Sequence, residues 1–261
     1  MTLHDYSTLP APQRLSTRAF RWTADRIIFT TDFEHDRFGK GSLGNIGART
    51  CTIPIGSNIT AHRGDLPRRP RVVYFGQIRP GKGVEDYLAL AAECIDSKLP
   101  FEFLVAGSAP ERHREYLSSV RTNAHPKIDW LVDLPSATIS EVLASSLAAY
   151  LPFPDGASHR RGSMLAALVN GLPVIAPCGG ATSRALADVI LPANDRTEAI
   201  GHLKRLSSSP EYTKAISAEV RRFGRKFSWA DIAREHRSTY DAILGSTRRL
   251  TRRHLELTNA K

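Results

Sequence analysis

The chain has 261 residues, of which 41% are hydrophobic and 24% charged, enough to bury one large core or two modest ones. No apolar run reaches the length of a membrane-spanning helix, and the first residues lack the apolar segment of a secretory signal, so we expect a globular protein of the cytosol. The three cysteines, Cys51, Cys94 and Cys178, are far apart, which indicates neither a disulfide framework nor a zinc site. The formal net charge of +10 favours anionic partners such as nucleotides, acidic lipid headgroups or nucleic acid.

The first 65 residues are predicted to form an incomplete α/β segment. The pattern indicates two helices, a strand and an extended piece, at residues 16–25, 33–39, 26–31 and 52–55 respectively. Three glycines between Gly41 and Gly47 indicate a loop, and residues 61–70, rich in Pro, Arg and Gly, indicate a linker. One or two strands cannot form a sheet with a covered face, so we expect the chain to begin inside a domain.

Residues 66–226 are predicted to form a Rossmann-like α/β domain, because short β-type runs alternate with helical ones from Arg71 onward. Six runs have the length and composition of strands: 72–75, 101–105, 128–131, 148–151, 173–175 and 189–191. Five segments between them have the spacing of helices: 84–96, 110–122, 139–146, 162–169 and 182–186. A parallel sheet of this kind binds its ligand at the carboxyl ends of its strands.

The last part of the chain, residues 227–261, is predicted to form a helix followed by a basic tail. Ser228 is a suitable N-cap for this helix. The tail, residues 247–254, contains four arginines. We favour a solvated, poorly ordered end; the alternative is binding to anionic lipid, which would need further charge or an acyl anchor.

A first basic loop follows the predicted strand 72–75. The run from Gly76 to Gly83 nearly matches a P-loop, but Gly83 stands where the magnesium-binding hydroxyl would be, so a P-loop is the weaker alternative. Lys82 and Arg79 instead indicate binding of a diphosphate at the ligand edge of the sheet. The alternative is a solvated lysine in a glycine turn.

A second basic loop follows the predicted strand 148–151. Arg160 and Arg161 precede Gly162 and Ser163, which open a helix whose free backbone N–H groups can bind an anion. Alternatively, the arginine pair is a solvated face and Ser163 only caps the helix. We interpret the Asp-Gly pair at 155–156 as a turn rather than as a catalytic acid.

In order and spacing, these segments resemble the donor-binding half of a GT-B glycosyltransferase of the family 4, "group 1", type. The resemblance rests on residues 73–83, 104–107, 155–177 and 227–229, and it covers nearly the whole chain. It implies two Rossmann-like lobes, with the nucleotide sugar in the C-terminal lobe and the acceptor in the N-terminal lobe. Residues 1–65 then resemble the end of the N-terminal lobe, and residues 227–261 the crossover helix and tail.

The resemblance also implies roles for individual residues. Its lysine is Lys82, whereas Gln77 stands in place of its usual arginine, a loss for which Arg79 can compensate. Its two glutamates fall on Ser158 and Ala166, which brings no carboxylate to either position. His4 resembles the histidine near the transferred sugar; the alternative is an ordinary histidine near a frayed terminus. The predicted catalytic residues are therefore His4 and Lys82, and the predicted donor-binding residues are Gly76, Gln77, Arg79, Lys82, Ser158, Arg160, Arg161, Gly162 and Ser163.

The function that the resemblance implies is retaining transfer of a hexosyl or related sugar from a nucleoside diphosphate sugar. The acceptor would be a saccharide or lipid-linked molecule, as in polysaccharide biosynthesis, with no bound metal and no cofactor besides the donor. We expect a cytoplasmic protein, with peripheral contact at an anionic inner membrane face and a partner chain supplying the missing lobe as further expectations. The alternative is a non-catalytic nucleotide-sugar-binding protein or subunit. Nucleic-acid binding is a weaker third interpretation, since only the net charge supports it.

Overall fold

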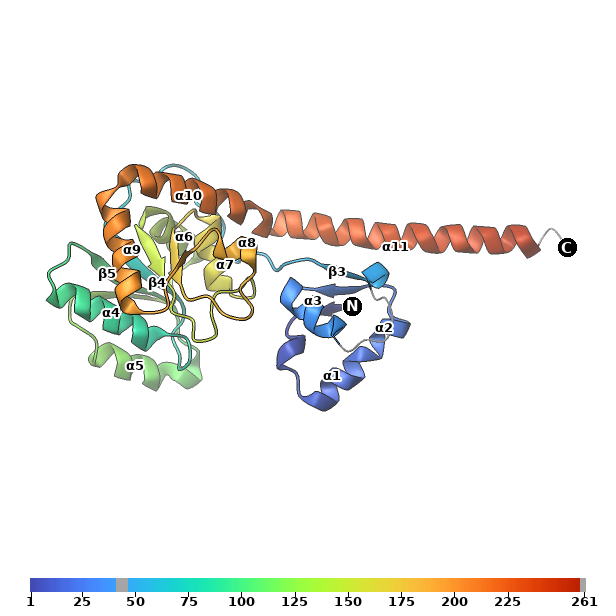
Figure 1. The fold of residues 1–261 in the computed structure, drawn as a ribbon, viewed down its shortest axis with the longest axis horizontal. Coiled ribbons are helices and arrows are strands. Elements are labelled where there is room, and N and C mark those ends of the chain that lie inside the picture. The colour runs from blue at the N-terminus through green and yellow to red at the C-terminus, as the bar shows by residue number, and fades with distance from the viewer. Residues whose placement is uncertain (41–46, 259–261) are drawn as a thin grey trace. The chain divides into compact units, whose positions relative to one another are not determined.

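The computed structural model describes residues 1–40 and 47–258. The chain divides into two compact units, one formed by Met1–Ile55 with Trp229–Lys261 and the other by Gly56–Ser228 (Figure 1). The loop expected between Gly41 and Gly47 lies, except for Gly47, outside the described residues. None of the helices described combines the length and the hydropathy that a membrane span requires.

The first unit contains a three-stranded parallel sheet in the order β1-β2-β3. Its strands are β1 (Thr2–Leu3), β2 (Ile27–Phe29) and β3 (Thr50–Thr52). The pattern alone predicted only one or two strands here. A strand of two residues, such as β1, is too short to show an alternating pattern, and its pairing with β2 joins residues far apart in the sequence.

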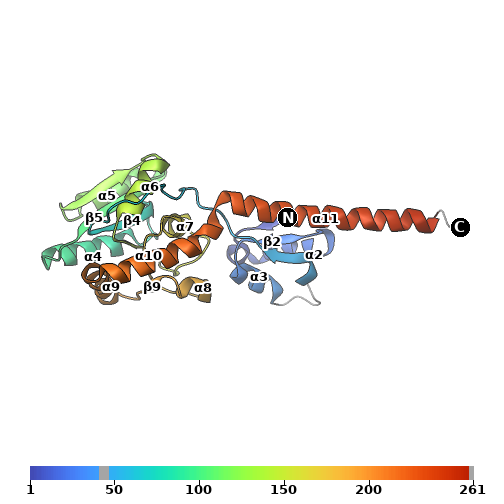
Figure 2. The same ribbon diagram turned by 90° about the horizontal axis from the view of Figure 1, so that it is seen from above.

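Helices surround this sheet. They are η1 (Tyr6–Thr8), α1 (Ala11–Arg18), α2 (Phe20–Thr23), α3 (Asp32–Gly39), η2 (Gly47–Arg49) and α11 (Trp229–Thr258). The single helix expected at 16–25 was wrong: α1 begins five residues earlier, because Pro12 in its first turn has a helical φ and no N–H to satisfy. Residues 247–254 were expected to form a poorly ordered tail, but their backbone continues helix α11 without a break (Figure 2).

Both faces of the small sheet are covered. One cluster joins η1, β2 and α3 through Tyr6, Ile27, Phe29 and Phe38. A second cluster on β2 and the segment after β3 includes Ile232 from the start of α11. The last helix therefore belongs to the same unit as the N-terminal residues. The chain passes from the first unit into the second at residue 56 and returns to the first unit at residue 229.

The second unit is built on a six-stranded parallel sheet in the order β6-β5-β4-β7-β8-β9. Its strands are β4 (Arg71–Gln77), β5 (Glu102–Ser108), β6 (Ile128–Val132), β7 (Ala148–Tyr150), β8 (Val174–Ala176) and β9 (Leu191–Pro192). All six predicted strands are present, and the predicted Rossmann-like fold is confirmed.

Helices cover this sheet on both faces, with α4 and α5 on one side and α7 with α10 on the other (Figure 1). The helices are α4 (Val84–Asp96), η3 (Glu111–His113), α5 (Arg114–Thr122), α6 (Ser136–Ser145), α7 (Gly162–Val169), α8 (Arg184–Ala187), α9 (Arg196–Ser208), α10 (Pro210–Gly224) and η4 (Arg225–Phe227). The bounds of α4 and α7 are those predicted. The first turn of the helix expected at 110–122 is instead the 3-10 turn η3.

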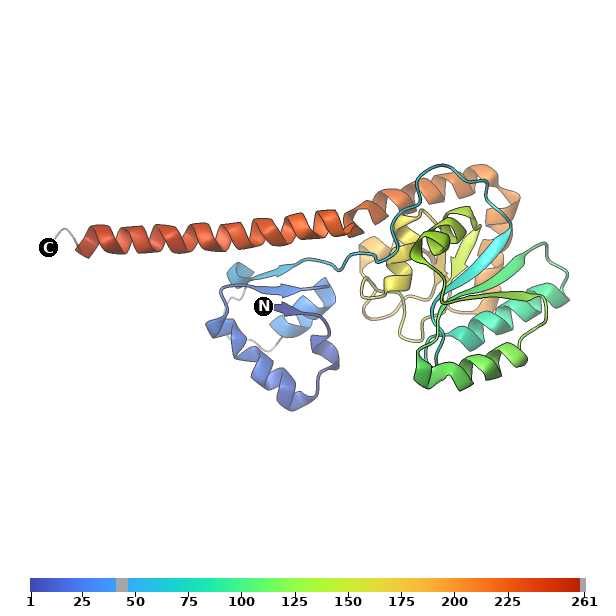
Figure 3. The ribbon, with the colours of Figure 1, turned by 180° about the vertical axis from the view of Figure 1, so that it is seen from behind.

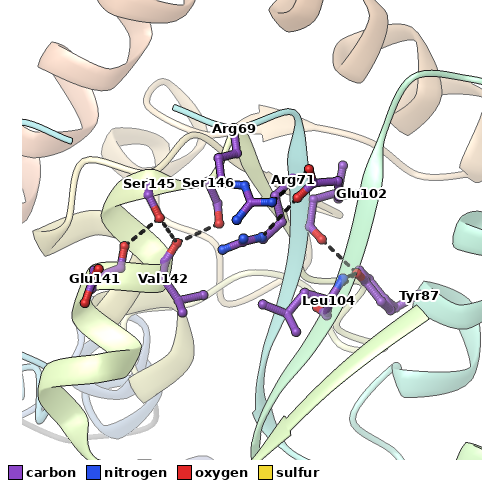
Figure 4. A network of polar contacts seen from close by, with 10 residues as sticks. Arg69, Arg71, Tyr87, Glu102, Leu104, Glu141, Val142, Ser145 and Ser146 are labelled. Carbon is purple, nitrogen blue, oxygen red and sulfur yellow. Dashed lines mark hydrogen bonds and ion pairs between the residues drawn. The ribbon is translucent and has the colours of Figure 1, made fainter. Parts of the chain in front are cut away.

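A buried tyrosine fixes the centre of the large sheet. The Tyr87 hydroxyl accepts a hydrogen bond from the Leu104 N–H at 2.9 Å and lies within donating distance of the Val72 and Leu104 carbonyl oxygens, at 2.9 and 3.0 Å (Figure 4). Burial raises the pKa of this hydroxyl, so it stays protonated and able to donate. One side chain of α4 thereby joins two adjacent strands.

The boundaries of the second unit differ slightly from residues 66–226. The Ser57 N–H donates to the Phe227 carbonyl at 2.8 Å, and the His62 N–H donates to the Asn170 side chain at 2.8 Å. Part of the segment expected to be a linker is thus bonded to the second unit, which begins at Gly56 and ends at Ser228.

Candidate functional site

The strand order places the two basic loops at one point of the large sheet. The chain runs from β4 through β5 to β6 in one direction and from β7 through β8 to β9 in the other, so the order reverses between β4 and β7. In open parallel sheets, ligands bind outside the carboxyl ends of the strands at such a reversal. The loops that follow these two strands are those predicted to bind a diphosphate.

The two loops touch through their backbones. Gly83, at the N-cap of α4, has a φ of +78°, and a Cβ at this position would overlap the carbonyl oxygen of Pro152 in the loop after β7. A Cβ on Gly76 would lie 3.6 Å from the Cβ of Ser163, in the first turn of α7. Glycine is therefore required at position 83, and the end of β4 lies against the start of α7.

The first loop is closed by a tyrosine that the sequence did not single out. The Tyr74 hydroxyl lies 3.2 Å from the Gln77 carbonyl oxygen and 3.1 Å from that of Lys82, so it can donate to either. Burial, with a smaller contribution from Glu85, raises the pKa of Tyr74 and keeps the hydroxyl protonated. The hydroxyl thus connects the beginning and the end of the loop.

Three cations meet beside this tyrosine. Burial lowers the pKa of Lys82, and the positive charges of Arg79 and Arg161 lower it further. Arg79 comes from the same loop, where its Nε donates to the Gln77 side chain at 3.1 Å. Arg161 comes from the other loop. Each loop therefore contributes a cation that acts on Lys82, and binding of a diphosphate by these groups stays a prediction.

Arg161 is held in place by its own loop. Its Nε donates to the Gly156 carbonyl at 3.2 Å, its guanidinium lies 4.2 Å above the Phe153 ring, and it forms an ion pair with Asp155. Only 14% of the Arg161 side chain is exposed, and burial lowers its pKa. Asp155, in the predicted turn at residues 155–156, thus positions Arg161 through this ion pair.

A third loop, which the prediction missed, packs against the second. It follows β8, where the Gly179 N–H donates to Thr182 Oγ1 at 2.8 Å, and this hydroxyl donates to the Ala157 carbonyl at 2.6 Å. A Cβ on Gly156 would overlap the backbone of Gly179. The signal in the sequence was the Gly-Gly pair that begins four residues after the end of the predicted strand 173–175. The loops after three neighbouring strands of the sheet, β4, β7 and β8, therefore form one connected edge.

The start of α7 is open to solvent. Gly162 is exposed, Ser163 and Arg160 are half-buried, and the side chain of the N-cap residue Arg161 makes no capping hydrogen bond. The free N–H groups of the first turn are therefore available to an anion beside the cations of the two loops. In the described residues no group of three His, Cys, Asp or Glu side chains is arranged to hold a metal ion.

Comparison with protein families gives a match to "Glycosyl transferases group 1" over residues 69–209. This range covers more than half of the chain and includes both basic loops and the strands that carry them. The chain belongs to the group 1 glycosyltransferases. No curated protein sequence matches it.

Solved structures of glycosyltransferase type have the same fold as this group 1 chain. Sucrose-phosphate synthase from Thermosynechococcus elongatus aligns with a TM-score of 0.70 at 18% identity, over 93% of this chain and 64% of that one. Anabaena HepE in complex with UDP gives 0.70 at 16% identity, over 92% and 72% of the two chains. The GtfA/B complex gives 0.68 at 13% identity, over 87% and 47%. The chain thus spans less than two thirds of the length of the first of these proteins.

Two positions of this group 1 chain carry no carboxylate where the resemblance implied glutamates. Ser158 is 3% exposed, and Ala166, inside α7, is fully buried. Nearby, the Arg161 N–H donates to the Ser158 carbonyl at 3.2 Å, so residue 158 contributes its backbone to the turn before α7. The sequence comparison identified this departure, and the structure places both residues below the surface of the loop.

His4 lies in the first unit, apart from the other predicted residues along the chain. It follows β1 directly, its side chain is exposed, and its carbonyl accepts a hydrogen bond from Thr30 Oγ1 at 3.1 Å. Thr30 follows β2, so both residues lie at the carboxyl edge of the small sheet. His4 is therefore at the edge where a parallel sheet binds ligands, and its catalytic role stays a prediction.

Proposed function

We propose that the second unit binds a nucleoside diphosphate sugar and that the protein transfers the sugar with retention of configuration and without a metal ion. Lys82, Arg79, Arg161 and the N–H groups at the start of α7 bind the two phosphates. The acceptor is a saccharide or a lipid-linked molecule bound by the first unit, alone or together with a partner chain. The protein acts in the cytoplasm, in contact with the inner membrane face where the acceptor is lipid-linked.

The observation that carries this proposal is the contact of two basic loops, one with Lys82 and Arg79 and the other with Arg161, at the reversal of strand order. Like charges repel, and burial makes each charge more costly, which is why the pKa of Lys82 is lowered. A diphosphate placed between these groups would remove the repulsion and restore the lost solvation. The arrangement is therefore costly when empty and favourable when an anion is bound.

The same groups suit the chemistry of transfer. When the bond between sugar and diphosphate breaks, negative charge grows on the phosphate oxygen that leaves. Lysine, arginine and helix N–H groups that are already aimed at this oxygen stabilise the charge without a metal ion. His4, at the edge of the first unit, is the proposed catalytic residue on the acceptor side, where its imidazole can accept a proton or a hydrogen bond.

One observation favours a second candidate function, a protein that binds nucleotide sugars without catalysis. Ser158 and Ala166 are both buried and neither can accept a hydrogen bond as a carboxylate does. Without these carboxylates, the ribose and the sugar would be held less firmly, while the diphosphate contacts would be unaffected. Binding without transfer is the outcome that this candidate predicts.

The test of the donor site compares UDP with uridine, and GDP with guanosine, by isothermal titration calorimetry. The double variant Lys82→Ala, Arg161→Ala should weaken binding of the diphosphate about 100-fold or more and leave the nucleoside within about twofold. Lys127→Ala is a matched control, because this exposed lysine lies at the opposite, amino end of a strand. Equal losses for diphosphate and nucleoside, or no binding of any nucleotide, would refute the proposal.

Catalysis is tested separately. Release of UDP or GDP from the nucleotide sugars is measured with saccharide and lipid-linked acceptors, with wild type and with His4→Ala. Loss of turnover in the variant with unchanged donor binding supports transfer by this chain. Tight binding with no release under any condition, including added cell extract as a source of a partner chain, supports the non-catalytic candidate.

A further inference from the structure

A hollow in the second unit lies at the edge opposite the diphosphate loops. It measures about 680 Å³ and is lined by the residues just before β4 and β7, the ends of α6 and α9, and one side of α10. The segment that precedes β4 runs over this side of the unit, beside α10 (Figure 3). The hollow is within the size range of small-molecule sites, and no part of the proposed function uses it.

Positive charge dominates its lining. Arg68, Arg69, Lys214 and Arg221 border the hollow, against a single carboxylate, Asp65. Arg69 is paired with Glu102 at 3.1 Å (Figure 4). Among the described residues, no ion pair joins Arg68, Lys214 or Arg221 to a carboxylate. Arg68 is half-buried and thus lacks the counter-charge that such arginines usually have, while Lys214 and Arg221 are exposed and face the hollow without a paired carboxylate.

Arg68 is a fixed and half-buried member of this group. It donates to the Ser146 carbonyl at 2.5 Å and to the Gly171 carbonyl at 2.7 Å, both just before strands of the sheet. Burial, followed by the nearby charge of Arg221, lowers the pKa of Arg68 to about 10. Arg221 lies against Gly171, where an added Cβ would be 2.8 Å from its Nε. The two guanidinium groups are therefore neighbours.

A buried hydroxyl in the same wall has no partner. Ser217, on α10, is 9% exposed and lines the hollow, and its Oγ makes no hydrogen bond in the described structure. A buried hydroxyl without a partner costs free energy. Its oxygen is shielded from solvent, so it can donate to an anion in the hollow once the side chain turns toward it. This is an observation independent of the cations, and it points to a ligand.

We propose that this hollow, named here the amino-edge site, binds a small organic phosphate monoester. The phosphate contacts Arg68, Arg221, Lys214 and the Ser217 hydroxyl, while an apolar body lies against Leu66, Leu147 and Leu206. A phosphate dianion fits better than a carboxylate, because it offers three oxygens and two charges to four donors. The site is separate from the diphosphate loops, so it can be occupied together with a nucleotide.

Calorimetry of the full chain with n-hexyl phosphate tests the proposal, with n-hexanol, hexanoate and inorganic phosphate as comparison ligands. Hexyl phosphate should bind at least about tenfold more tightly than each of the other three. Arg221→Gln and Lys214→Gln should each weaken its binding about tenfold or more. Arg222→Gln is the matched control, because its side chain is 78% exposed on the same helix and does not line the hollow; it should change the affinity by less than about twofold.

Three results would overturn the proposal. If hexanol or hexanoate binds as tightly as hexyl phosphate, the hollow does not recognise the phosphate group. If Arg221→Gln and Arg222→Gln weaken binding equally, the ligand does not bind at the amino-edge site. Displacement of hexyl phosphate by saturating UDP would place the phosphate in the diphosphate loops instead. If Arg221→Gln does not fold, Ala218→Trp at the exposed rim should block binding without touching the core.

Discussion

Tyr74 and Tyr87 are both buried, and their ring centroids lie 5.7 Å apart. We expect loss of the hydroxyl to affect mainly UDP binding at Tyr74 and mainly stability at Tyr87. Tyr74→Phe removes the connection between the Gln77 and Lys82 carbonyls of the diphosphate loop. Gln77 is exposed and Lys82 half-exposed, so water can replace the lost hydrogen bond. The expected cost to the free energy of unfolding is about 1 kcal/mol. If that support also holds the loop in its binding conformation, UDP affinity falls by up to about fivefold.

Tyr87→Phe should lower the stability of the second unit and leave the UDP affinity nearly unchanged. It leaves the Leu104 N–H and the Val72 carbonyl without the hydroxyl between β4 and β5, where no water reaches. Each unsatisfied buried group costs about 1 to 3 kcal/mol, so we expect about 3 kcal/mol of destabilisation of the second unit. Its melting temperature should fall by about 6 to 12 °C. UDP affinity below the transition should stay within about twofold, because no loop contact is lost.

Urea denaturation followed by tryptophan fluorescence and circular dichroism gives the stability of each variant, and calorimetry with UDP gives the affinity. The reasoning predicts that the two measurements rank the variants in opposite order. If Tyr74→Phe proves the more destabilising variant, or if both variants lose affinity in proportion to stability, Tyr74 has no positioning role in the loop.

Three more outcomes follow from the site. Gly83→Ala should weaken UDP binding about tenfold or more, because the added Cβ meets the Pro152 carbonyl. At Gly81 the φ is similarly positive but the space is open, so Gly81→Ala should cost only backbone strain of about 1 to 2 kcal/mol. Similar UDP affinities of the two variants in calorimetry would contradict the loop contact. UDP affinity should fall as the pH rises toward and through the pKa of Lys82, which is lowered below 10.5. Binding in this pH range should take up protons, because a bound diphosphate raises that pKa again. Titrations in buffers of different ionisation enthalpy measure the proton uptake, and Lys82→Gln should abolish it. Removing divalent metal with EDTA should leave UDP binding unchanged within about twofold, as side-chain cations take the place of the ion; a larger loss would show that a metal takes part.

The second unit could be predicted closely because its signals are local. Each strand is a short apolar run between turn residues, and α4 and α7 begin after glycine or arginine and end with their apolar pattern. The sequence also predicted which loops share an edge, since that follows from the parallel topology. What it could not supply are contacts between distant segments: the Tyr74 hydroxyl closing a loop, the packing of the Gly179 loop on residues 155–157, and the ion pair of Arg161 with Asp155.

The first unit was harder to predict for the same reason. Its three strands contain two or three residues each and pair across more than twenty positions of sequence. The face of the sheet opposite α3 is covered by a helix that begins at Trp229, and no pattern within residues 1–55 reveals that partner. The amino-edge site likewise depends on α10 meeting the segment before β4, which lies well over a hundred residues earlier.

The hydrogen bond between Ser57 and Phe227 has a practical corollary. Residues 56–228 are inserted into the chain of the first unit, and the segments that enter and leave them are hydrogen-bonded to each other. Two neighbouring peptide segments, rather than one linker, then connect residues 56–228 to the rest of the chain. This hydrogen bond also marks the place where residues 56–228 can be excised for separate expression, or where new chain ends can be introduced.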